Sequence, residues 1–188
     1  MLYQILDLPA LPDNLKKMAW EYAGVEQKDA LNPWVLGYTH GRKLFKGDKE
    51  HGVSTGLPRK QISKDFNQWI HDNITDQFHD VGVCISEAGL DHSGPHRDQS
   101  REFTLMYVLK QGSENATTTF WKEKPGVPVS NYYDNYNDLE FLDQINIPLE
   151  TWCLLNGRAI HSVENIKEGR ISIQVSLNQN PWSAVNNT

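Results

Sequence analysis

The sequence predicts a mainly β protein, a double-sheet jelly roll of about eight strands with helices packed on one sheet. Short segments rich in β-branched and aromatic residues follow one another from about residue 79, and turns containing Gly, Pro or Asn separate them. Two amphipathic helical segments precede these strands. An immunoglobulin-like sandwich is the alternative, but that fold does not need two long amphipathic helices.

The composition is that of one soluble globular domain: of 188 residues, 38% are hydrophobic and 22% are charged. We expect a single domain over 1–188, with a helical supporting region over 1–78, a jelly-roll core over 79–180 and a tail over 181–188. The net charge of −6 argues against a protein that neutralises phosphate backbones, so no nucleic-acid partner is expected. No apolar run is long enough to cross a membrane.

The N-terminus has neither the basic region nor the long apolar region of a signal peptide. Cys84 and Cys153 both lie in apolar, strand-like segments, so reduced buried thiols are expected and a fortuitous disulfide is the minor alternative. These features predict a cytoplasmic protein. The sequence does not define its oligomeric state.

The first third of the chain supplies the predicted helices. After an apolar lead over 2–11, Pro12-Asp13-Asn14 is typical of a helix start, and the apolar residues that follow have helical spacing. Residues 34–39 fit a strand, and 40–56, rich in Gly, Lys and His, fit a loop. A second helix with one apolar stripe is expected after Pro58, and its predicted role is to cover a sheet. The stripe consists of Ile62, Phe66, Trp69, Ile70 and Ile74.

The expected strands are 81–85, a short segment around His96, 103–109, 117–121, 139–147, 151–155, 159–163 and 170–177. The last of them alternates strictly between polar and apolar residues. Its polar residues are Arg170, Ser172, Gln174 and Ser176, and its apolar residues are Ile171, Ile173, Val175 and Leu177. An ordinary surface strand with its polar face in water would show the same pattern.

A candidate metal site lies in the segment Gly94-Pro95-His96-Arg97-Asp98. Alternate side chains of an extended segment point to the same side, so His96 and Asp98 are expected to project together while Arg97 turns away. An imidazole and a carboxylate side by side are two of the ligands of a 2-His-1-carboxylate facial triad, which leaves positions open on Fe(II). Alone, this spacing is a weak signal, because a solvated loop can carry it by chance.

His161 is the candidate third ligand. Its strand and the strand that begins at Arg170 are expected to form an antiparallel hairpin with an even-numbered turn over 166–169. Without a bulge, this register places His161 on the same sheet face as Arg170 and Ser172. The polar face of the last strand would then line a cavity and its isoleucine face would meet the helices. A guanidinium fixed there binds a carboxylate bidentately, and a serine hydroxyl adds a donor.

The pattern H-x-D, a long gap and then H-x8-R-x-S resembles that of the iron(II)/2-oxoglutarate-dependent oxygenases of the double-stranded β-helix fold, over roughly residues 80–178. The resemblance implies that His96, Asp98 and His161 are the iron ligands and so the catalytic residues. It further implies that Arg170 pairs with the distal carboxylate of 2-oxoglutarate and that Ser172 assists it. Within the family, the Ser-Gly-Pro-His-Arg-Asp segment is most similar to that of small amino-acid and peptidyl hydroxylases, including the aspartyl/asparaginyl and proline hydroxylase types.

This resemblance implies an oxidoreductase that uses Fe(II), 2-oxoglutarate and O2. The expected reaction is hydroxylation of an unactivated C–H bond in an amino acid, a peptide side chain or a small molecule, with release of succinate and CO2. The carboxylate of Asp98 favours hydroxylation, because halogenating relatives lack it. Tyr107 is a candidate contact for 2-oxoglutarate, but its strand is apolar on both faces, so a core tyrosine fits equally well.

Residues 131–138 are unusual in placing Tyr132, Tyr133 and Tyr136 among polar side chains. The segment is either a mobile surface loop or a lid that closes over the substrate. Near the candidate site, His92 is either a pocket wall or a surface histidine. Arg101 pairs with Asp98, pairs with Glu102, or is solvated.

Two other classes of function fit part of the pattern. A metal-binding jelly-roll protein without oxygenase activity, acting as a sensor or binding module, would use the triad but has no use for a buried guanidinium at Arg170. An iron or zinc hydrolase or isomerase on a cupin-like barrel would more naturally use three or four histidines. The sequence does not distinguish a free amino acid from a peptide as substrate.

Overall fold

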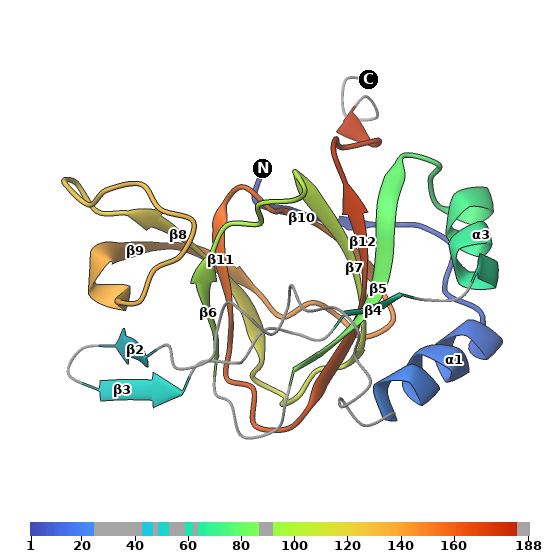
Figure 1. Ribbon diagram of the computed structural model, residues 1–188, viewed down its shortest axis with the longest axis horizontal. Helices are drawn as coiled ribbons and strands as arrows, with labels where there is room; N and C mark the ends of the chain where they lie inside the picture. The colour runs from blue at the N-terminus through green and yellow to red at the C-terminus, as the bar shows by residue number, and fades with distance from the viewer. Residues whose placement is uncertain (25–42, 47–48, 53–58, 62–63, 87–91, 184–188) are drawn as a thin grey trace.

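The computed structural model describes residues 1–24, 43–46, 49–52, 59–61, 64–86 and 92–183 (Figure 1). Two antiparallel sheets face each other, and two helices cover the outer face of the larger sheet. The protein is a mainly β jelly roll with helices on one sheet, as predicted.

The larger sheet contains, in spatial order, β1 (Tyr3–Leu6), β10 (Trp152–Asn156), β7 (Phe103–Lys110), β12 (Arg170–Leu177), β5 (Phe78–Ser86) and β4 (Arg59–Gln61). The smaller sheet contains β6 (His92–His96), β11 (Ile160–Glu164), β8 (Thr117–Glu123) and β9 (Leu139–Ile145). From β5 to β12 the chain passes repeatedly from one sheet to the other, which is the jelly-roll connection. These eight strands correspond to the eight segments expected from the sequence.

Three features of the first third differ from expectation. The apolar lead forms β1, which pairs with β10 at one edge of the larger sheet, and β4 pairs with β5 at the other edge. Residues 40–56 were expected to form a loop, but their described part contains a hairpin of β2 (Lys43–Lys46) and β3 (Lys49–Gly52). The strand expected over 34–39 lies outside the described residues.

The helices α1 (Asp13–Gly24) and α3 (Lys64–Asn73) bury their apolar stripes against the larger sheet. Leu15 and Ala19 come from α1, and Phe66 and Ile70 come from α3. The apolar face of β12 lies in the same cluster, which consists in part of Ile171, Ile173, Val175 and Leu177. The apolar residues of the two helices recur at helical spacing because they are the ones that pack against the sheet. Removing this apolar area from water stabilises the fold.

Every residue of β12 is buried, so the strand is covered on both faces and the surface-strand alternative is wrong. Its apolar side faces the helices, and its polar side faces the space between the two sheets. A second apolar cluster shares that space and contains Met106, Phe120 and Cys153. Polar and apolar groups therefore lie together in the interior, on the side away from the helices.

Cys84 and Cys153 are buried free thiols, as expected. Burial raises the pKa of the Cys153 thiol to about 12, so this cysteine is protonated near neutral pH. None of the described helices has the length and hydropathy that a membrane span requires.

Candidate metal centre

His96 ends β6, and His161 lies directly opposite it on the neighbouring strand β11. The centroids of the two imidazole rings are 4.5 Å apart. Nδ1 of His96 lies 2.9 Å from the carbonyl oxygen of Gly94, and Nδ1 of His161 lies 3.0 Å from that of Ala159. Because a carbonyl only accepts, each Nδ1 carries the proton and each Nε2 keeps a free lone pair. Such carbonyl contacts orient metal-binding histidines.

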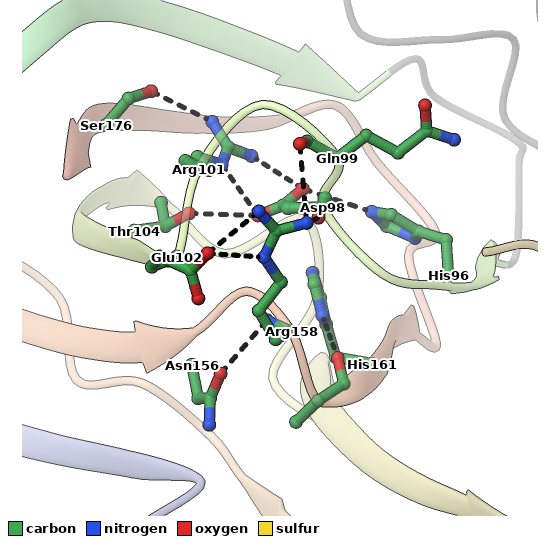
Figure 2. A network of polar contacts seen from close by, with 11 residues as sticks. His96, Asp98, Gln99, Arg101, Glu102, Thr104, Asn156, Arg158, His161 and Ser176 are labelled. Carbon is green, nitrogen blue, oxygen red and sulfur yellow. Dashed lines mark hydrogen bonds and ion pairs between the residues drawn. The ribbon is translucent and has the colours of Figure 1, made fainter. Parts of the chain in front are cut away.

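Asp98 follows the end of β6, and its backbone N–H donates to the carbonyl oxygen of Gly157 at 2.7 Å. Its Oδ1 lies 3.7 Å from Nε2 of His96. The ligand atoms of His96, Asp98 and His161 all lie within 4.8 Å of one another, so one ion can contact all three. The structure therefore brings the predicted triad together (Figure 2).

Arg97 turns away from the triad, as the alternation predicts. Its Nη2 donates to Glu123 at 2.7 Å, and its Nη1 donates to the hydroxyl of Tyr133 at 2.6 Å. Nε of Arg97 also donates to the carbonyl oxygen of Arg158 at 3.1 Å. These contacts hold β6 against the segment that precedes β9.

The interior sets the protonation of the ligands. Burial, together with the neighbouring His96, lowers the pKa of His161 to about 4. Burial alone would raise the pKa of Asp98, but the guanidinium of Arg101 and the neighbouring His161 hold it below its ordinary value. Near neutral pH the site thus contains a neutral His161 imidazole and a carboxylate, which are the forms that bind metals.

Arg101 pairs with Asp98 and not with Glu102. Its Nε donates to Oδ2 at 2.6 Å and its Nη2 donates to Oδ1 at 3.0 Å (Figure 2). Thr104 also donates to Oδ2, at 3.1 Å. Glu102 instead accepts from Arg158, whose Nη1 also donates to the backbone oxygen of Asp98 at 3.1 Å.

No pattern in the sequence indicates the contacts that Thr104, Gly157 and Arg158 make with Asp98 and its neighbours. Arg158 lies 60 residues from Asp98 in sequence, so no local pattern marks the pair. Only the packing of the turn after β10 against the turn after β6 brings them together.

Arg170, at the start of β12, is buried with 3% of its surface exposed. Its Nη2 contacts Sδ of Met106 at 3.7 Å, and its Nη1 has no hydrogen-bond partner within the described part of the chain. Among the described residues, no carboxylate forms an ion pair with it. Burial lowers the pKa of Arg170 to about 10, well below its ordinary value, yet it stays protonated near neutral pH. Ser172 is also buried on this polar face of β12.

The predicted hairpin between the His161 strand and the Arg170 strand is wrong. β11 pairs with β6 and β8, and β12 pairs with β5 and β7, so the two strands belong to different sheets. Residues 165–169 cross from one sheet to the other, and Asn165 adopts a positive φ of 60° there. The predicted shared sheet face is therefore wrong as well, but His161 and Arg170 both lie on inner faces, in the interior between the two sheets. The inner faces of two facing sheets meet there.

Tyr107 is not placed to contact a molecule bound beside His96, Asp98 and His161. It lies in the cluster on the helix side of β7, with its ring 4.7 Å from that of Trp152. Strand alternation explains this, because Met106 faces the interior and its neighbour must face the helices. Of the two alternatives for Tyr107, the core tyrosine is correct.

Side-chain hydrogen bonds anchor the segment 131–138 to neighbouring strands. The hydroxyl of Tyr133 contacts Glu123 and Arg97, and the hydroxyl of Tyr136 donates to Glu164 at 2.5 Å. Both tyrosines are buried and cannot close over a substrate. Only Tyr132 reaches the candidate site, where its half-buried ring stacks on that of His96 at 6.3 Å. The side chain of His92 lies outside the described part of the chain.

No protein-family model and no curated protein matches the chain. One solved structure with a similar fold is described as an oxidoreductase of the 2OG-Fe(II) oxygenase family, from Burkholderia pseudomallei. The two share 10% sequence identity with a TM-score of 0.44, and the match covers 73% of this chain and 72% of that chain. A likeness this distant does not extend to function.

Proposed function

We propose that this protein is an Fe(II)- and 2-oxoglutarate-dependent oxygenase that hydroxylates an amino acid, a peptide side chain or another small molecule. The observation that carries the proposal is Arg170, a buried guanidinium without a carboxylate partner among the described residues. Its guanidinium lies in the interior between the two sheets, which also contains His96, Asp98 and His161.

A buried, unpaired guanidinium is costly, and proteins rarely keep one unless it binds something. Replacement by an apolar residue of similar size would remove that cost. The fork of Arg170 matches a carboxylate, and no residue that the structure describes accepts a hydrogen bond from its Nη1. An anionic ligand entering between the sheets would supply the missing partner. The nearby hydroxyl of Ser172 is a candidate second donor.

The triad fits Fe(II). Two imidazoles and one carboxylate are the ligand set of non-haem iron oxygenases, whereas structural zinc sites close four positions with protein ligands. Both Nε2 lone pairs are free, because backbone carbonyls hold the Nδ1 protons. Within the described residues, His96, Asp98 and His161 form the one group of this kind.

In this assignment, each protein group has a separate task. His96, Asp98 and His161 hold the metal, and Arg170 binds the distal carboxylate of 2-oxoglutarate. Fe(II) with 2-oxoglutarate and O2 supplies the oxidising power for C–H hydroxylation, with succinate and CO2 as the other products. The apolar neighbours Met106 and Phe120 exclude water from the interior and so strengthen charge interactions there.

Tyr132 is the candidate substrate contact. It flanks His96, the most exposed of the three ligands, so it borders the side of the site that is open to solvent. The contacts of Arg97 with the carbonyl oxygen of Ser130 and with Tyr133 hold this short segment in place. We propose that Tyr132 forms one wall of the substrate site.

The deciding experiment is an anaerobic titration of the metal-free protein with Fe(II), followed by 2-oxoglutarate. We expect Fe(II) to bind first and 2-oxoglutarate to bind much more tightly to the metal-loaded protein than to the metal-free one. An amino-acid and peptide screen in air, with succinate as the readout, would then identify the substrate. Metal binding that leaves the affinity for 2-oxoglutarate unchanged would support a metal-binding jelly-roll protein without oxygenase activity.

A further inference from the structure

The two carboxylate oxygens of Asp98 have different environments (Figure 2). Oδ2 accepts from Nε of Arg101 at 2.6 Å and from the hydroxyl of Thr104 at 3.1 Å. Oδ1 accepts one longer hydrogen bond, from Nη2 of Arg101 at 3.0 Å, and is the oxygen near Nε2 of His96. With two donors, Oδ2 has both of its lone pairs engaged, whereas Oδ1 with one donor keeps a lone pair for another partner.

Arg101 is itself fixed in place. Its side chain is only 12% exposed, and its Nη1 donates to Oγ of Ser176 at 3.3 Å. Ser176 is near the end of β12, so the guanidinium connects the turn after β6 to the larger sheet. A planar fork that donates to both oxygens defines the plane of the carboxylate as well as its position.

Gly157, in the turn between β10 and β11, lies close to Asp98. A Cβ at this position would lie 2.9 Å from Oδ2 and 3.1 Å from Cβ of Asp98. Asp98 therefore lies against the backbone of the β10–β11 turn with no room for a side chain between them, and Arg101 holds its carboxylate.

We infer that Arg101 is a positioning residue that fixes Asp98 as a one-oxygen metal ligand through Oδ1. The inference rests on the metal site of the proposed function and adds a residue that the ligand pattern does not contain. A carboxylate that bound through both oxygens would take two of the positions around an octahedral ion. With both lone pairs of Oδ2 engaged by Nε of Arg101 and by Thr104, only Oδ1 would bind the metal, and three positions would stay open for ligands from solution.

Arg101 could instead act only as a counter-charge to Asp98. This alternative predicts the opposite change in metal affinity when the arginine is replaced. Arg101→Gln removes a positive charge beside the metal, so charge alone would make the variant bind a divalent cation more tightly. Loss of positioning would make it bind more weakly, by about 10- to 100-fold, as when outer contacts of metal ligands are removed. Arg101→Lys keeps the charge but loses the fork, so positioning predicts a loss there as well.

The test uses Mn(II) as the probe in the full chain. Affinity is measured by competition with a chelator, and metal-bound water is counted by water-proton relaxation. We expect three exchangeable waters in the wild type, weaker binding and a changed water count in Arg101→Gln and Arg101→Lys, and a smaller loss in Thr104→Val. Lys122→Gln is the matched control, since Lys122 also pairs with a carboxylate, that of Glu140, on the exposed surface of the smaller sheet, and it should bind Mn(II) like the wild type.

Unchanged affinity and water count in both Arg101 variants would overturn the inference, and so would tighter binding in Arg101→Gln with wild-type behaviour in Arg101→Lys. Thr104→Val removes one hydroxyl at constant shape, so it tests the same point if the Arg101 variants fail to fold. A wild-type protein that binds no divalent metal would contradict the proposed function itself. Metal binding without any effect of Arg101 would contradict only the inference.

Discussion

His96 and His161 face each other across the β6–β11 pair, with both Nδ1 atoms on backbone carbonyls and Nε2 of His96 3.7 Å from Oδ1 of Asp98. The geometry predicts that each of the three side chains supplies one of only three protein bonds to the metal. His96→Ala, Asp98→Ala and His161→Ala should each abolish tight Fe(II) binding in an anaerobic titration, with the fold retained by circular dichroism. The exposed His79 is the control, and His79→Ala should bind iron normally. A ligand variant with wild-type iron affinity would refute the role of that residue.

Acid should destabilise the metal-free protein through His161. Its pKa is about 4 in the folded protein, against about 6.5 in an unfolded chain. The folded state therefore binds this proton less readily, so the free energy of unfolding should fall as the pH drops from about 6.5 toward 4, by about 3 kcal/mol at most. Asp98, whose pKa is below its ordinary value, should add a further loss at lower pH.

Denaturant unfolding across this pH range measures the effect, and His161→Gln should show a shallower dependence than the wild type. The same slope in both proteins would show that other groups cause the acid sensitivity. Metal-loaded protein should also release its metal in this range, because a protonated imidazole cannot bind it.

Replacing Arg170 should weaken 2-oxoglutarate binding strongly, whereas the free energy of unfolding should not depend on this arginine in the same way. Arg170→Ala should weaken 2-oxoglutarate binding by about 2–4 kcal/mol, or roughly 30- to 1,000-fold, and Arg170→Lys should recover only part of it. Arg170→Met should bind the cosubstrate equally poorly but leave the free protein more stable, by about 1 kcal/mol or more, because a buried charge is replaced by an apolar side chain beside Met106. Calorimetry and denaturant unfolding measure the two quantities. Normal 2-oxoglutarate affinity together with lower stability would assign Arg170 a purely structural role.

Tyr132 should affect the coupling of the reaction, whereas Tyr133 and Tyr136 should not. Tyr132→Ala removes the ring beside His96, so the substrate should be held less well and product should fall while succinate persists. Tyr133→Phe removes a buried hydrogen-bonding hydroxyl and should cost about 1–2 kcal/mol of stability with coupling intact. Parallel measurements of succinate and product in both variants distinguish these outcomes. Equal losses of succinate and product in Tyr132→Ala would leave Tyr132 without a role in substrate binding.

The sequence predicts those features of this structure that depend on residues close together in the chain. It does not predict contacts between residues that are far apart in the chain. The eight strands and the two faces of β12 are local patterns, and they were predicted correctly. The partner of β11 is not local, since a connection over 165–169 can close a hairpin or cross between sheets, and here it crosses. Tyr133 is buried because Arg97, 36 residues earlier, and Glu123 meet its hydroxyl, which no pattern within 131–138 reveals. The three candidate metal ligands were identifiable because a His-x-Asp pair followed by a later His and Arg is a specific order of residue types, and the strand pairing that brings them together was not predicted.

A side chain at Gly157 should disturb metal binding, because this glycine lies against the candidate ligand Asp98. In Gly157→Ala, the new Cβ would lie 2.9 Å from Oδ2 of Asp98 and 3.3 Å from the backbone oxygen of Glu102, so the carboxylate or the turn must move. We expect a loss of stability of about 1–3 kcal/mol from the overpacking and a loss of metal affinity because Asp98 leaves its position. Gly126 provides the contrast, because a Cβ there meets nothing within 4 Å but the residue has a φ of 86°. Gly126→Ala should therefore lower stability through backbone strain and leave Mn(II) affinity unchanged. If the two alanine variants lose similar stability and both keep wild-type affinity, the close contact between Gly157 and Asp98 has no part in metal binding.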